Sequence, residues 1–196
     1  MDLKNITSKS FLGKAGNVLF YGLLIFFVFS TDAKSWALEK LVSIGLFKAE
    51  IKKDTPAQEL VQNSVSFSYY DASGQQVSIS ALKGKVVFIN FWATWCPPCR
   101  AEMPSLNALY NKFKGDDRYV FLFISEDEDL SKAKTYLQKE GFDIPLASST
   151  GTVPSQIYSG TLPTTIVLNK DGQVVLKKEG IGAYNTPAFI KQLKDL

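Results

Sequence analysis

Histidine is absent from this 196-residue chain, and cysteine occurs only twice. Without imidazole, the sequence excludes Ser-His and Cys-His catalysis, histidine-ligated metal sites and the usual pH switch. A structural zinc site would need carboxylates for half of its ligands, and two cysteines cannot form a disulfide scaffold while leaving a reactive thiol. We therefore expect no metal site, and we expect the two cysteines to act as a pair.

An excess of charge of one sign is also missing. Lys and Arg number 22 against 19 acidic residues, a formal net charge of +3, and part of the excess lies at the N-terminus. This balance gives no reason to expect a nucleic-acid partner. A hydrophobic content of 45% with 13% aromatic residues is sufficient for a folded core, and the length suits one domain with an appendage.

The N-terminal segment combines a basic flank with a long apolar block. Lys4, Lys9 and Lys14 precede residues 15–31, which carry no charge and as a helix would span about 25 Å, slightly less than a hydrocarbon core of about 30 Å. Two interpretations remain open, a retained single-pass anchor with lysines reaching both interfaces and a cleaved signal peptide. Adopting the anchor, we expect residues 1–34 to cross the inner (cytoplasmic) membrane and the C-terminal bulk to be periplasmic or extracytoplasmic.

Residues 35–60 follow as a predicted amphipathic helix and a linker. Apolar residues recur there at helical spacing, at Leu38, Leu41, Val42, Gly45 and Leu46. The helix can lie on the membrane surface beside the anchor, or it can pack on the domain that follows, and both alternatives stay open. The polar stretch 52–59, which contains Pro56, is the expected linker.

The remaining residues, 61–196, show the patterns of an α/β domain. Alternation around Ser73 and Gly74 predicts a hairpin, and "GKVVFINFWATW" is an uninterrupted apolar run typical of a central strand buried on both faces. Further patterns predict a helix over about 97–113, a buried strand ending at Ser125, a helix over "EDEDLSKAKTYLQKEG", a hairpin turning at Asp171-Gly172, and a final helix capped by Asn185 or Thr186. Buried strands joined through helices indicate an α/β sandwich with a mixed sheet.

The two cysteines, Cys96 and Cys99, fall where the buried strand gives way to a helix. A helix N-terminus stabilises a thiolate, so this placement activates Cys96 to attack disulfides. Cys99 lies one turn further on and is placed to resolve a mixed disulfide formed at Cys96. Pro97 and Pro98 suit the first helical turn and stiffen the ring that a disulfide would close. A static disulfide gains little from closing so short a loop, so we predict a redox-active pair.

The cysteine pair lies within the string "NFWATWCPPCRAEMPSL", with Trp95 before the pair and Pro104 after it. A second motif, "TLPTT", occurs about 65 residues downstream. Together these motifs resemble the active site of thioredoxin-fold thiol-disulfide oxidoreductases, in particular their exported TlpA/ResA/CcmG-like branch. The resemblance covers about residues 61–196. It implies a thioredoxin-like three-layer sandwich with a mixed central sheet, preceded by a membrane-anchor helix. It also implies no cofactor beyond the redox-active disulfide, partner proteins that carry disulfides or thiols, and a membrane electron donor.

The resemblance assigns roles to residues far from the pair. Pro163 in "GTLPTTIVL" matches the family's cis-proline, which lies against the cysteines, although an ordinary trans turn proline is the alternative. The backbone of Leu162 would then pair with an incoming peptide as an added strand. Trp92 and Trp95 are expected to divide between the core and the rim of the substrate surface.

Glu102 matches the acidic residue of this branch. Its implied role is to hold a raised pKa and to move protons to or from Cys99, whereas the alternative is an exposed acid favoured by the helix dipole. Asn90 departs from classical thioredoxin, which has a buried aspartate at the matching place, and this gives Glu102 more weight in proton handling. The acidic run 126–129 is expected to be a solvated helix start, with a role in choosing basic partners as the alternative.

These features predict an extracytoplasmic thiol-disulfide oxidoreductase that reduces disulfides of partner proteins, such as apocytochrome c before haem attachment. The Pro97-Pro98 dipeptide lacks the histidine of the strongly oxidising CPHC type, which favours a reductant. A disulfide oxidase or isomerase remains the alternative. A peroxiredoxin-like peroxidase would require a lone peroxidatic cysteine, and a copper-binding assembly factor of the SCO type would require CxxxC and a distant histidine.

Overall fold

The computed structural model describes residues 4–47, 49–51, 66–151 and 153–196, with side chains of the first helix described from Asn17 onward. The predicted linker and the predicted domain boundary near residue 61 lie outside the described residues. In chain order the elements are α1 (Lys4–Phe29), α2 (Thr31–Ser43), β1 (Ser68–Tyr70), β2 (Gln76–Ser78), the 3-10 helix η1 (Ile79–Leu82), β3 (Val86–Trp92), α3 (Pro97–Phe113), β4 (Tyr119–Ser125), α4 (Leu130–Glu140), β5 (Leu146–Ser149), β6 (Thr164–Leu168), β7 (Val174–Glu179) and α5 (Pro187–Lys194).

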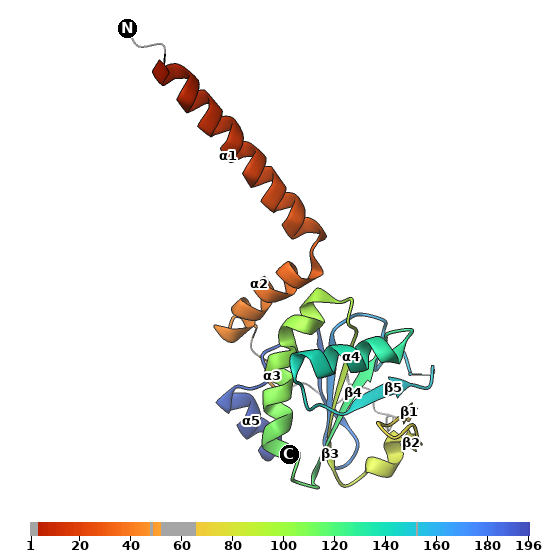
Figure 1. Ribbon diagram of the computed structural model, residues 1–196. Coiled ribbons are helices and arrows are strands. Elements are labelled where there is room, and N and C mark those ends of the chain that lie inside the picture. Colours follow the sequence, from red (N-terminus) through yellow and green to blue (C-terminus); the bar gives the residue numbers. More distant parts are fainter. Residues whose placement is uncertain (1–3, 48, 52–65, 152) are drawn as a thin grey trace.

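The strands form one mixed sheet in the order β2-β1-β5-β4-β3-β6-β7 (Figure 1). β3 pairs in parallel with β4, and β4 pairs in parallel with β5. β6 runs antiparallel to β3, β7 antiparallel to β6, and the predicted N-terminal hairpin of β1 and β2 joins the sheet through β5. The carboxyl ends of β3, β4 and β5 therefore share one edge with the start of β6, and loops at such an edge are where α/β proteins place their sites.

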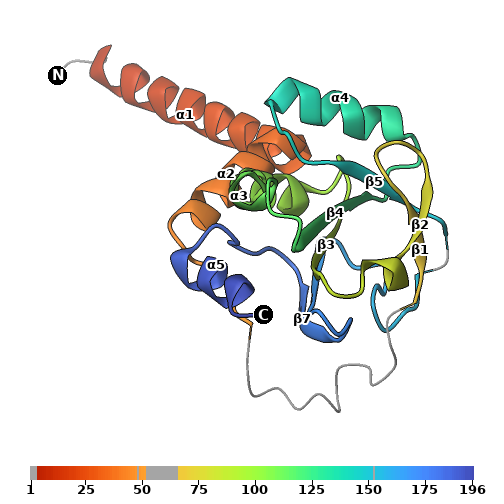
Figure 2. The same ribbon diagram turned by 90° about the horizontal axis from the view of Figure 1, so that it is seen from below.

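Alternate residues of β3 enter two separate cores. Phe88 and Trp92 pack into a cluster with α3, α4 and α5, which lie together on one side of the sheet (Figure 2). Val87, Ile89 and Phe91 pack into a second cluster with η1 and the loop between β5 and β6. Every residue of β3 is buried, which explains its uninterrupted apolar run. The prediction of a layered α/β fold with a mixed central sheet and an N-terminal hairpin is confirmed.

Two local features differ from the sequence prediction. The sequence analysis did not predict β5, whose four residues are too few to show a periodicity. The helix expected to begin within the acidic run starts only at Leu130, because Asp129 is its N-cap and accepts a hydrogen bond from the amide of Ser131 at 2.9 Å. The acidic residues before Asp129 therefore lie outside the helix, in the loop at the carboxyl edge of the sheet.

The N-terminal helices meet at a sharp corner. Ser30 caps α2 by accepting a hydrogen bond from the amide of Ala33 at 3.2 Å. Among the described residues, no single helix is both long and apolar enough to cross a bilayer. The pair Asn17–Phe29 and Thr31–Ser43 meets that criterion together by length and composition, with a bend of 85° between them. The large apolar side chains of α1 from Val18 to Phe29 are exposed.

The helix α2 packs on the domain, which is one of the two arrangements left open by the sequence. Ser35 and Val42 are its buried residues, and α2 makes extensive contact with α3. Beyond α2 the chain stays on the domain, because the amide of Ala183 donates to the carbonyl of Phe47 at 2.6 Å and the amide of Ile51 donates to the side chain of a glutamine in α5 at 2.9 Å. Both α2 and the segment after it are thus integrated with the folded core (Figure 1).

Candidate active site

The two cysteines lie where β3 gives way to α3. Cys96 is the N-cap of α3, and its backbone is extended while Pro97 and Pro98 occupy the first helical positions. The amide of Cys99 donates a hydrogen bond to Cys96 Sγ at 3.2 Å. This arrangement follows from the sequence. The backbone N–H groups of a first helical turn have no acceptor within the helix, and proline has no N–H to leave unpaired. Proline also fixes φ at a helical value. The first turn of α3 therefore directs a backbone N–H at the Cys96 sulfur.

The cysteines are joined in a disulfide, with their Cα atoms 5.3 Å apart. Cys96 is 4% exposed and Cys99 is fully buried, so an approaching sulfur reaches the pair through Cys96. Trp95 beside it is 63% exposed, whereas Trp92 is fully buried in the core. Trp92 thus belongs to the core and Trp95 to the surface of the protein.

The loop before β6 reaches the same edge of the sheet as the loop that leads to the cysteines. The Leu162–Pro163 peptide bond is cis. Thr164, the first residue of β6, pairs with Phe91 near the end of β3, so Pro163 lies at the sheet edge from which the active-site loop leaves. Leu162 is partly buried and packs against the cluster that contains both cysteines.

Glu102 is fully buried on α3, three residues after Cys99, and residues at that spacing are neighbours on one face of a helix. Its Oε1 accepts a hydrogen bond from Asn90 Nδ2 at 2.8 Å, and its Oε2 accepts one from the amide of Gly182 at 3.0 Å. Burial raises the pKa of Glu102 from 4.5 to about 8, although both hydrogen bonds and the charge of Lys178 act in the opposite direction. The exposed-acid alternative for Glu102 is therefore wrong.

Two residues that sequence reasoning missed complete the setting of Glu102. Gly182 leaves no room for a side chain unless Tyr184 shifts, because a Cβ there would lie 2.5 Å from the ring of Tyr184, which is itself fully buried. Thr165 accepts a second hydrogen bond from Asn90 Nδ2 at 3.0 Å and so ties β6 to β3 beneath the site. Asn90 could be noticed in the sequence, because it is a polar residue within an apolar strand. Nothing in the sequence distinguishes Gly182 from the other glycines in loops.

The acidic run at the end of β4 does not behave as one solvated group. Asp127 is buried, and its carboxylate accepts hydrogen bonds from the amide and the hydroxyl of Thr94, at 3.0 and 2.6 Å, and from the hydroxyl of Ser125 at 2.9 Å. Thr94 lies two residues before Cys96, so Asp127 fixes the loop that leads into the cysteine pair. Glu126 is partly buried, and Glu128 is exposed.

Arg100 connects the active-site helix to two other helices. It forms an ion pair with Asp32 in the first turn of α2, and its guanidinium lies 5.1 Å from the ring centroid of Tyr136 on α4. The side chain of Arg100 is only 17% exposed. The first turns of α2 and α3 are therefore joined beside the disulfide.

The chemistry available at this edge is thiol-disulfide exchange. A cysteine pair at a helix N-terminus, on the same helix as a buried carboxyl and at the same sheet edge as a cis-proline, can exchange two electrons with a disulfide or a dithiol. Within the described residues, no group of three or more Cys, Asp or Glu side chains is arranged to hold a metal ion. The fold and the site define a thiol-disulfide oxidoreductase that works through a redox-active cysteine pair.

The Redoxin family profile matches residues 54–187, and the chain belongs to this family. The thiol-disulfide oxidoreductase ResA from a strain of Bacillus cereus is 36% identical over 125 residues, which cover 63% of this chain and 72% of that protein. ResA of Halalkalibacterium halodurans is 31% identical over 139 residues, which cover 69% of this chain and 78% of that protein. A crystal structure of a thioredoxin-family thiol:disulfide interchange protein from Chlorobium tepidum TLS has a TM-score of 0.55 at 27% identity, covering 66% of this chain and 93% of that one. The predicted TlpA/ResA/CcmG-like relationship and thioredoxin-like fold are confirmed.

Proposed function

We propose that this protein is an extracytoplasmic protein-disulfide reductase held at the inner membrane by α1. The observation that carries the proposal is the placement of the buried Glu102 carboxyl on the same helix face as the buried Cys99, beneath the more accessible Cys96. This arrangement separates a sulfur that meets the substrate from a sulfur whose proton must be moved inside the protein. It gives the two cysteines different tasks.

In the first step the reduced protein presents Cys96 as a thiolate. The amide of Cys99, which contacts Cys96 Sγ, and the partial positive charge of the helix N-terminus stabilise this charge. Cys96 attacks one sulfur of a substrate disulfide, the substrate S–S bond breaks, and the other substrate sulfur leaves and takes a proton. The substrate chain pairs with the backbone of Leu162 beside Pro163, and Trp95 forms the opposite rim.

In the second step the ionised form of Glu102 accepts the thiol proton of Cys99. The Cys99 thiolate attacks Cys96 Sγ, the mixed disulfide breaks, and the second substrate sulfur leaves and is protonated. Two electrons have passed from the cysteine pair to the substrate, and the protein is left in the oxidised form that the structure describes. A carboxyl with a pKa of about 8 suits this transfer, because a proton exchanges readily between groups of similar pKa.

The cycle closes only if a dithiol donor reduces the disulfide again. For a domain outside the cytoplasm the electrons must cross the membrane, so we infer a membrane-embedded dithiol donor. The exposed apolar side chains of α1 and the lysines ahead of them support an anchor with the domain on the extracytoplasmic side. The Pro97-Pro98 dipeptide supports the reducing direction, and the family resemblance implies the disulfide of apocytochrome c, before haem attachment, as a substrate.

The reduction potential of the Cys96–Cys99 pair tests the direction of transfer. We expect a value near or below that of thioredoxin, about −270 mV, when the full-length protein is equilibrated with glutathione or dithiothreitol buffers in detergent. A value near −120 mV, at the strongly oxidising end of the range, would refute the reductase and identify a disulfide donor instead. Reduction of insulin disulfides by the pre-reduced protein, compared with Cys96→Ser, provides the matching activity readout.

A further inference from the structure

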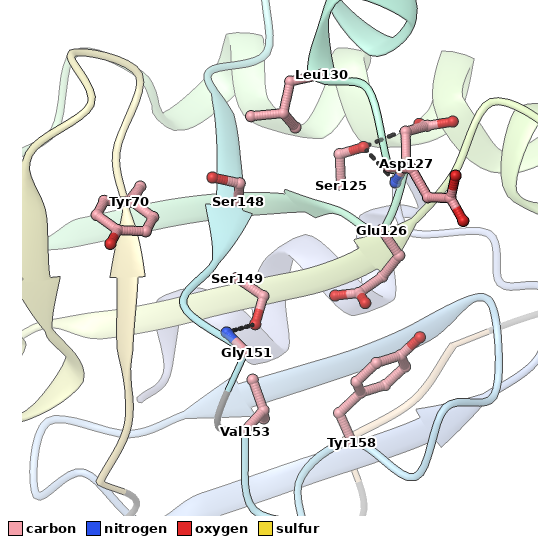
Figure 3. A pocket seen from close by; sticks show the side chains of 11 residues that line it. Tyr70, Ser125, Glu126, Asp127, Leu130, Ser148, Ser149, Gly151, Val153 and Tyr158 are labelled. Carbon is pink, nitrogen blue, oxygen red and sulfur yellow. Dashed lines mark hydrogen bonds between the residues drawn. The ribbon is translucent and has the colours of Figure 1, made fainter.

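A cavity of about 460 Å³ opens beside the active-site loop, at the carboxyl ends of β4 and β5 (Figure 3). Its walls come from four parts of the chain, namely β1 with Tyr70, the end of β5, the loop after β5 with Tyr158, and the loop after β4 with Glu126. A volume of this size lies within the range of ligand sites, about 300–1,000 Å³, and admits a long side chain.

The cavity is fixed directly to the redox site. Ser125, the last residue of β4, pairs with Trp92, the last residue of β3. The amide of Glu126 donates a hydrogen bond to the carbonyl of Trp92 at 2.8 Å. The short loop that leads to Cys96 starts directly after Trp92, so the cavity wall and the cysteine are connected through this loop.

The inner wall carries an unpaired negative group. The carboxylate of Glu126 points into the cavity, and its Oε1 is buried without a hydrogen-bond partner in the described structure (Figure 3). The neighbouring Asp127 adds negative charge, although its oxygens are engaged by Ser125 and Thr94. The described residues that line the cavity include neither Lys nor Arg. A buried carboxylate oxygen without a partner favours a ligand that brings both a positive charge and a donor.

The remaining walls suit the stem of such a ligand. The Tyr158 ring stacks on Phe91 with a centroid distance of 4.3 Å and an interplanar angle of 2°, which holds it firmly against the core. Leu130 and Val153 add apolar surface, and Tyr70 stands on the opposite side (Figure 3). Long basic side chains lay their methylene stems on such surfaces, and their cations are attracted to tyrosine rings.

We infer that this cavity is a subsite for a Lys or Arg side chain of the disulfide-bearing substrate protein, with Glu126 as the residue that pairs with its charge. The inference rests on the proposed reductase function and narrows its substrate class to segments with a basic residue near the disulfide. The basic side chain adds binding energy at a place separate from the backbone of Leu162, so the substrate is held at two places near the reacting sulfur.

The test uses the full-length protein, pre-reduced, and three synthetic peptides with one internal disulfide. The peptides are identical except for Lys, norleucine or Glu at the two positions that flank the disulfide. We expect kcat/KM for the Lys peptide to exceed that for the norleucine peptide about tenfold, with the Glu peptide slowest, because a hydrogen bond to a charged group contributes at least this much. Glu126→Gln should remove the preference for Lys while leaving reduction of the norleucine peptide unchanged.

Glu140→Gln is the matched control, since it removes the same charge from an exposed position outside the cavity. This control should keep the Lys preference. The subsite would be refuted if the wild-type protein reduced the three peptides at equal rates. It would also be refuted if Glu126→Gln lowered kcat/KM equally for all three peptides. Neither result would contradict the proposed reductase function. If the cysteine pair of the protein is in its reduced form and still reduces none of the three peptides, the proposed function itself fails.

Discussion

Replacing Glu102 by glutamine should remove most of the pH dependence that this buried carboxyl gives to the stability of the oxidised protein. Glutamine keeps the shape of the side chain. Its carbonyl oxygen can accept the hydrogen bond from the amide of Gly182, and its amino group can donate to Asn90 Oδ1 once the Asn90 amide turns over. Turning the Asn90 amide over also ends its hydrogen bond to Thr165 and moves Nδ2 to the place where Oδ1 has no partner in the described structure. The substitution therefore carries a cost in the free energy of unfolding, but this cost does not depend on pH.

The size of the effect follows from the two pKa values of Glu102. Burial raises the pKa from 4.5 in the unfolded chain to about 8 in the folded protein. Between these values the folded protein keeps a proton that the unfolded chain has released, so the free energy of unfolding falls as the pH rises. Integrating this difference from pH 5 to pH 9 gives a loss of about 4 kcal/mol in the wild-type protein, at about 1.4 kcal/mol for each pH unit crossed. The variant lacks the titrating group and should not show this loss.

The measurement is guanidinium unfolding of both oxidised proteins in detergent at pH 5, 7 and 9, followed through tryptophan fluorescence, which changes when the buried Trp92 becomes exposed. The difference between the free energies of unfolding of the two proteins at each pH reports the titration of Glu102, because every other titrating group is common to both. The free energy of unfolding of Glu102→Gln, relative to wild type, should rise steadily across this range. Parallel pH profiles for the two proteins would refute the assignment of a raised pKa to Glu102.

The other predictions concern the cysteines and the glycine beside the site. Cys99→Ser should accumulate a mixed disulfide between Cys96 and a substrate peptide, detectable as a mass increase on non-reducing separation, and the absence of any adduct would contradict Cys96 as the nucleophile. Gly182→Ala should lower the free energy of unfolding by about 1–3 kcal/mol, because its Cβ would overlap the Tyr184 ring. Gly115→Ala, where a Cβ meets nothing within 4 Å, is the control, and equal effects of the two changes would refute the steric argument.

The parts of the fold that the sequence predicted well have local causes. The limits of α3 follow from the proline pair after the cysteine and the periodic apolar residues that end at Phe113, and the structure places the helix over the predicted range. The hairpin at Asp171-Gly172 likewise depends on two adjacent residues, and Gly172 adopts the positive φ of 79° that such a turn requires. Patterns of this kind need no knowledge of the rest of the chain.

The features that could not be predicted depend on contacts between distant segments. Asp127 belonged to a run of four acids, and only the approach of Thr94 from another loop makes it a buried anchor. The hydrogen bond from Gly182 to Glu102 joins residues 80 positions apart. The sequence indicated that Glu102 carries function through a family resemblance, whereas the groups that hold its carboxyl came from the tertiary structure alone.

The ion pair between Asp32 and Arg100 has a consequence for how the protein meets its partners. Asp32 follows the last residue of α1 by three positions, and Arg100 follows Cys99 by one. With α1 in the bilayer as proposed, the redox pair is held at the level of the lipid headgroups and does not swing at the end of a tether. A dithiol donor embedded in the same membrane would then reach it by lateral diffusion in two dimensions, whereas a soluble protein would have to bring its disulfide down to the membrane surface.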